Sequence, residues 1–119
     1  MTDADPQRVA CMEALLNDLG GRLNAGELTA LEAVTLAVEA MEDEPLFNAG
    51  KGSVLDETGK VTMDASIMRG QDQAAGAVVG LTTTRHPVRA AHRLLVRGWP
   101  VMLAGGAGAV SYTHRRCRR

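Results

Sequence analysis

The chain has 119 residues, which is enough for one domain with a hydrophobic core and too few for a two-domain enzyme. Its net charge is −1 and charged residues make up 23%, so composition gives no case for binding nucleic acid or an anionic membrane. No apolar run approaches the roughly 18–20 residues of a membrane span, and no basic segment followed by an apolar stretch indicates a secretory signal, so we expect a cytoplasmic location.

Two amphipathic helices are predicted in the first third of the chain. Asp5-Pro6 is typical of a helix start, and Asn24-Ala25-Gly26 of a helix end. The apolar stripe between them has three- and four-residue spacing and comprises Val9, Met12, Leu15, Leu16, Leu19 and Leu23. A second helix is expected from about Glu27. Its stripe is Leu31, Val34, Val38 and Met41, with Glu32 and Glu39 facing away. The short connection predicts antiparallel packing.

The pattern changes to strands after residue 52. Residues 53–55 and 61–63 flank a polar turn that contains Gly59, which predicts a β-hairpin. The apolar run 75–83 contains two glycines and is typical of a buried strand closely approached by a neighbour. A third helix is predicted from Pro87 to the stop at Gly98, with Val88, Ala91, Leu94 and Leu95 facing the core. Residues 101–104 then predict a short buried strand.

The two ends of the chain carry few chemical signals. Cys11 and Cys117 are too few and too far apart for a disulfide framework or a metal site, and Cys11 is expected to be a small buried hydrophobe. Residues 111–119 contain four arginines and no apolar period, so we predict a basic tail that is disordered or non-native. Residues 1–110 are assigned to one domain region, separate from this tail.

The loop from Glu42 to Ser53 is the most informative segment. Pro45 cannot continue a helix and biases Glu44 away from helical dihedral angles. Gly50 and Gly52 permit a positive φ angle or the close approach of another backbone segment. A loop with these features usually positions a ligand or a catalytic group.

Four segments together carry a resemblance to a known family. In chain order they are AVEAMEDEPLFNAGKGSVL, VTMDASIMRG, AGAVVGL and RHPVRAAHRLL. From about Pro6 to Ala104 the chain resembles the plant-type asparaginase / isoaspartyl aminopeptidase family of N-terminal nucleophile (Ntn) hydrolases. The resemblance implies an α/β (α+β) fold, here a partial αββα sandwich of the Ntn-hydrolase type, with residues 1–110 as a partial α-subunit domain.

The same resemblance implies an activity and a set of site residues. Family members cut their own backbone and hydrolyse L-asparagine or β-aspartyl peptides with a new N-terminal threonine, whose α-amine is the general base. The family's loop binds a structural sodium ion through main-chain carbonyls, and Asn48 supports the threonine region. The family assembles as (αβ)2, with the β-subunit as the partner. Carried over to this chain, the carbonyl donors are Met41, Glu42, Glu44, Phe47, Ala49 and Lys51.

The catalytic threonine itself is not found in this sequence. It would follow Gly or Asp directly, and the chain has no Gly-Thr or Asp-Thr pair. No residue is therefore predicted to act as the nucleophile or to bind substrate, and the chain alone is expected to be inactive. The alternative is a non-enzymatic α/β module that binds a partner or a small ligand.

The other polar residues give weaker signals. His86 precedes Pro87 and is expected to be a surface or capping residue, while His92 lies six residues further on, on a different helix face. Asp64 could be a catalytic acid, but within the family pattern we expect it to make structural hydrogen bonds to the loop.

Overall fold

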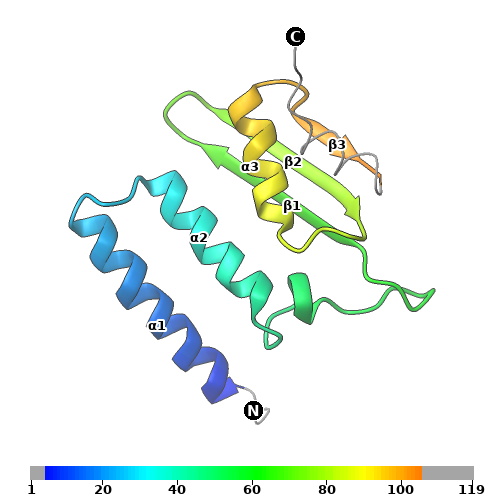
Figure 1. Ribbon diagram of the computed structural model, residues 1–119, viewed down its shortest axis with the longest axis horizontal. Helices are drawn as coiled ribbons and strands as arrows, with labels where there is room; N and C mark the ends of the chain where they lie inside the picture. Colours follow the sequence, from blue (N-terminus) through cyan, green and yellow to red (C-terminus); the bar gives the residue numbers. More distant parts are fainter. Residues whose placement is uncertain (1–4, 106–119) are drawn as a thin grey trace.

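The fold is α+β, with three helices and one small sheet in the part of the chain that the structure describes, residues 5–105 of a computed structural model (Figure 1). The predicted basic tail at residues 111–119 lies outside this range. In chain order the elements are α1 (Asp5–Asn24), α2 (Ala30–Asp43), the short 3-10 turn η1 (Gly50–Gly52), β1 (Met63–Arg69), β2 (Ala74–Leu81), α3 (Pro87–Arg97) and β3 (Met102–Ala104).

The two N-terminal helices pack antiparallel, as the sequence predicts. α1 and α2 lie side by side and run antiparallel (Figure 1). α2 begins at Ala30 rather than near Glu27, because Thr29 and Glu32 form a capping box. The Thr29 hydroxyl accepts the Glu32 N–H at 3.2 Å, and the Glu32 carboxylate accepts the Thr29 N–H at 2.8 Å.

The stripe of α1 is less buried than its spacing predicts. Leu19, at 9% exposure, is the one buried residue of the stripe, whereas Leu16 is 72% exposed and Val9 and Met12 are more than half exposed. These side chains line an apolar groove of about 610 Å³ between α1 and α2. The sequence pattern correctly identified the apolar face of α1, and within residues 5–105 α2 is the element that mainly packs against it. Cys11 is likewise half-buried rather than fully buried.

The sheet is mixed and has the order β1-β2-β3. β1 pairs antiparallel with β2, and β2 pairs parallel with β3. The predicted hairpin at residues 53–63 is wrong in detail: its arms meet only at a single bridge between Leu55 and Val61, and continuous pairing starts at Met63. Asp56 supports the turn instead, since its carboxylate accepts the N–H groups of Thr58 and Lys60.

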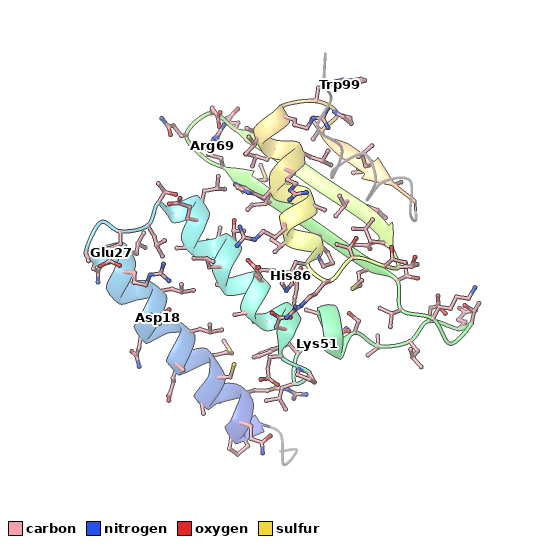
Figure 2. All side chains as sticks on the ribbon, viewed as in Figure 1. Asp18, Glu27, Lys51, Arg69, His86 and Trp99 are labelled. Atoms are coloured by element: carbon pink, nitrogen blue, oxygen red, sulfur yellow. The ribbon has the colours of Figure 1, made fainter. Side chains whose placement is uncertain are left out.

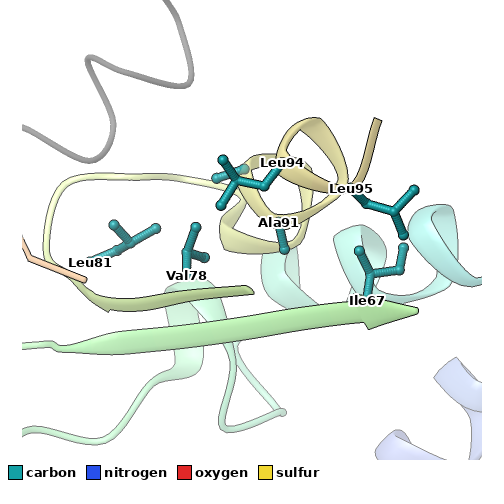
Figure 3. Packing of buried hydrophobic residues seen from close by; sticks show 7 residues of the cluster. Ile67, Val78, Leu81, Ala91, Leu94 and Leu95 are labelled. Carbon is teal, nitrogen blue, oxygen red and sulfur yellow. The ribbon is translucent and has the colours of Figure 1, made fainter. Parts of the chain in front are cut away.

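The core lies between α3 and the sheet (Figure 3). Every residue predicted to face the core from α3 is buried, and α3 starts at Pro87 and ends at Gly98, which has φ +78°. The strand residues that join the buried α3 side chains in the core are Ile67, Val78 and Leu81. The strand predicted at 101–104 forms as β3, but it is an edge strand with exposed Met102 and Ala104 rather than a buried one.

None of the helices within residues 5–105 is both long and apolar enough to cross a membrane.

Candidate functional site

The loop that follows α2 folds back tightly on the helix it leaves. Glu44 ends α2 in an extended conformation, and its N–H donates to the Met41 carbonyl. Its side chain then accepts the N–H of Leu46 at 3.3 Å. Further along, the N–H groups of Phe47, Ala49 and Gly52 each donate to a loop carbonyl two or three residues earlier. Local hydrogen bonds thus fix the course of the loop before any ligand is considered.

Both loop glycines are required by the close approach of carbonyl groups. A methyl group on Gly52 would overlap the Phe47 carbonyl oxygen and lie 2.5 Å from that of Pro45. A methyl group on Gly50 would overlap the Glu42 carbonyl oxygen, and Gly50 also has φ +52°. The sequence prediction that these glycines allow a second backbone segment to come near is confirmed, and that segment is the loop itself.

Asn48 lies where the loop meets a polar cavity. Its amide oxygen accepts the Val54 N–H at 2.9 Å, which ties the outgoing chain to the loop. The cavity has a volume of about 290 Å³ and is bounded by the loop, α2, β1 and the start of α3. Its polar wall is formed by Glu42, Asn48, Ser53, Thr62, Asp64 and Ser66.

The side chain of Glu42 forms part of the wall of this cavity and is buried. It is 3% exposed, and its Oε1 accepts the Val88 N–H in the first turn of α3 at 2.9 Å. Burial raises the pKa of Glu42, and the hydrogen bond from Val88 partly opposes that rise. Its Oε2 has no hydrogen-bond partner within residues 5–105.

A cluster of charged residues joins α2 to the start of α3 beside Glu42. His86 lies between the two helices (Figure 2), with Nδ1 3.1 Å from Glu39 and Nε2 3.1 Å from Asp43. Arg85 donates to Asp43 at 2.9 Å, and this bond, with the contact from His86, lowers the pKa of Asp43. Arg89 donates to Glu39 at 2.6 Å.

Two sequence expectations are corrected by these contacts. Glu39 does not face away from the core side of α2, because it faces α3 and binds His86 and Arg89. Asp64 does make a structural hydrogen bond, but its partner is the N–H of Gly80 in β2 at 2.8 Å rather than the loop. That bond lies at the register shift between Met63 and Ala65, where β1 and β2 depart from regular pairing.

The six predicted carbonyl donors all lie at the end of α2 or in the loop. They are Met41, Glu42, Glu44, Phe47, Ala49 and Lys51. Four of them, Met41, Glu44, Phe47 and Ala49, already accept one backbone hydrogen bond. Since a carbonyl oxygen has two lone pairs, such a bond still leaves one for a cation. The carbonyls of Glu42 and Phe47 lie against the glycines, in a space that any side chain at residues 50 or 52 would fill. This donor set fits a hard cation such as sodium.

The side chain of Glu42 has a role that the sequence analysis did not predict. Glu42 was expected to contribute its main-chain carbonyl, whereas its side chain also joins α2 to α3. A sequence signal existed in the acidic run 42–44 before Pro45 and in the His86-Pro87 helix start. The pairing was not predicted because Glu42 and Val88 are 46 positions apart in sequence.

Comparison with known proteins gives a consistent result. The model of the family described as Asparaginase matches residues 4–116. A plant-type L-asparaginase of Thermococcus kodakarensis and one of Pyrococcus furiosus are each 49% identical to the chain over 84 residues. An isoaspartyl peptidase/L-asparaginase of Homo sapiens is 45% identical over 84 residues. Each match covers 71% of this chain and 27% of the relative, so the matched region spans about a quarter of the length of these proteins. Since the family model extends over nearly the whole sequence, the chain belongs to the asparaginase family.

Proposed function

We propose that this chain is part of an amide hydrolase that acts on L-asparagine or on β-aspartyl peptides. Relatives that are 45–49% identical are named as L-asparaginases or isoaspartyl peptidases. The observation that carries the proposal is the loop geometry: Asn48 lies at a polar cavity, and the loop folds so closely on itself that Gly50 and Gly52 admit no side chain.

The nucleophile is supplied from outside these 119 residues. The sequence has no Gly-Thr or Asp-Thr pair at which a threonine could be released by self-cleavage. In this proposal the chain plays the part of an α-subunit, and a β-subunit headed by threonine completes an αββα sandwich and an (αβ)2 assembly. The cavity beside Asn48 is where the two parts meet.

In this proposal the residues of this chain orient the active site, and the threonine of the β-subunit carries out the reaction. Asn48 keeps its amide fixed through the bond to Val54, so the amide is already oriented when the partner's threonine arrives. A sodium ion held by the carbonyls of Met41, Glu42, Glu44, Phe47, Ala49 and Lys51 would supply positive charge that holds the loop together. Asp43, 3.9 Å from the Lys51 ammonium, adds a weak tie at the end of the loop.

The test is ammonia release from L-asparagine and from a β-aspartyl dipeptide. The purified chain alone is expected to release none, whereas the chain mixed with the remaining, threonine-containing part of the Thermococcus relative is expected to be active. In that mixture, Asn48→Ala should lower the rate on the order of 100-fold, as expected when reacting groups are misplaced. Asn17→Ala, on the exposed side of α1, is the matched control and should leave the rate unchanged.

Two outcomes would contradict the proposal. Turnover by the chain alone would mean that it contains a nucleophile. Failure to form an active complex, together with tight binding of some other partner or small ligand, would favour a non-enzymatic α/β module instead.

A further inference from the structure

Glu42 is fixed at both of its ends to different parts of the molecule. Its side chain reaches α3, where Oε1 accepts the Val88 N–H at 2.9 Å. α3 begins at Pro87, and the side chain of His86, its N-cap residue, makes no capping hydrogen bond to the helix. A carboxylate from another helix therefore satisfies a donor that the local sequence leaves open.

The main chain of the same residue is fixed to the loop. The Glu42 carbonyl packs directly on Gly50, and a methyl group at residue 50 would come within 2.7 Å of the Glu42 carbonyl carbon. Glu42 is 3% exposed, so neither end can move far without disturbing its packing. A displacement of the loop carbonyl would pull on the bond to Val88.

The neighbouring contacts between α2 and α3 differ from this one in kind. Glu39 and Asp43 are joined to α3 and its approach by His86, Arg85 and Arg89, and these side chains are partly solvent-exposed. The Arg85–Asp43 and Arg89–Glu39 pairs, whose arginine side chains are 68% and 46% exposed, are screened by solvent and individually weak. The buried bond from Glu42 is thus the stiffer connection between the loop and α3.

We propose that Glu42 is a positioning residue that couples cation binding in the loop to the start of α3. The inference rests on the sodium site of the proposed function. When the loop carbonyls hold sodium, the Glu42 main chain is fixed and its carboxylate is held against Val88. Coupling of this kind is reciprocal: capping of α3 by Glu42 must strengthen sodium binding by the same factor.

The direct test is amide hydrogen exchange of the unaltered chain, measured by NMR in sodium chloride and in choline chloride at equal ionic strength. Sodium should slow exchange at Phe47 and Gly52 in the loop, and at Val88 by at least about 5-fold, the lower end of typical coupling between sites. Leu95, in the distant half of α3, is the internal reference and should change far less.

Three variants separate coupling from simple loss of stability. Glu42→Ala should abolish the sodium response at Val88 and weaken sodium binding, measured by 23Na NMR titration, by the same factor. Glu42→Gln keeps an oxygen acceptor and should retain most of the response. Glu39→Gln removes a charge from the exposed cluster and is expected to leave the response at Val88 unchanged.

The outcomes also distinguish this inference from the sodium site itself. If no loop amide responds to sodium, the cation site fails and the coupling fails with it. If Phe47 and Gly52 respond but Val88 does not, the site stands and the coupling is overturned. Should Glu42→Ala not fold, the unaltered chain and Glu42→Gln still decide between these results.

Discussion

The pKa values of two turn carboxylates, Asp56 and Asp72, are lowered by hydrogen bonds from residues close to them in sequence. Asp56 accepts hydrogen bonds from Lys60 and Thr58, and these lower its pKa. Asp72, in the turn between β1 and β2, is bound through both oxygens by Arg69 at 2.8 and 2.5 Å and also accepts the Ala74 N–H. The paired guanidinium holds the pKa of Asp72 down to about 2.

This pairing predicts how the β1-β2 turn responds to acid. Because the pKa of Asp72 is lower in the folded chain than its ordinary value of 3.8, its contribution to stability is present above pH 3.8 and is lost as the pH falls toward about 2. Carboxyl 13C NMR should give a titration midpoint near that lower value.

Arg69→Gln should move the Asp72 midpoint up toward 3.8, whereas Arg22→Gln, in an exposed pair on α1, should leave it in place. An Asp72 midpoint that is the same with and without Arg69 would show that the pair does not form in solution.

Among the elements, α3 and β2 make the closest contact. Gly76 in β2 lies directly beneath α3, and a methyl group there would overlap the Ala91 carbonyl oxygen and lie 2.5 Å from the Leu95 nitrogen. The helix backbone can rest on the strand only because residue 76 has no side chain. The core in Figure 3 depends on this spacing, since Val78 of β2 and Leu94 of α3 belong to the same buried cluster between strand and helix.

Gly76→Ala should therefore push α3 away from the sheet and lower the free energy of unfolding by about 1–3 kcal/mol, the usual cost of overpacking. Urea denaturation followed by circular dichroism measures the change. Gly70→Ala, in the turn of the same hairpin with open space around it, is the matched control and should shift the midpoint little. Equal midpoints for the two variants would contradict the close contact.

The elements also show which features a sequence can reveal. α3 was predicted from Pro87 to Gly98 because its start, stripe and stop are local signals. The loop was located correctly for the same reason, through Pro45, Gly50 and Gly52. The pairing of β1 with β2 was not predicted, although a short turn joins them, because the sequence pattern paired residues 61–63 with 53–55 instead. The hydrogen bond from the Val88 N–H to Glu42 was not predicted because its two residues are 46 positions apart in sequence. Glu39 was misplaced because its partners belong to another helix.

As a whole, the molecule is thin and leaves much apolar surface open. Its principal dimensions are 48 × 43 × 22 Å, and within residues 5–105 the helices accompany one three-stranded sheet. Leu16, Met12 and Val9 remain more than half exposed along the groove between α1 and α2. A contiguous apolar surface of this kind is unusual for a self-contained domain. The local pattern of α1 could predict which residues are apolar, but not that so little of the chain would cover them.

The groove should bind the hydrophobic dye ANS while the chain is folded, since such dyes bind exposed apolar surface. Leu16→Gln places a polar side chain in the groove and should lower ANS fluorescence markedly, with helix content unchanged because glutamine favours helices about as well as leucine. Val54→Gln is the matched control: Val54 is 68% exposed, close to the 72% of Leu16, but lies in the loop before β1 and not in the groove. If both variants lost ANS fluorescence equally, the dye would be responding to general loosening of the fold. A loss confined to Leu16→Gln would place the principal apolar surface between α1 and α2.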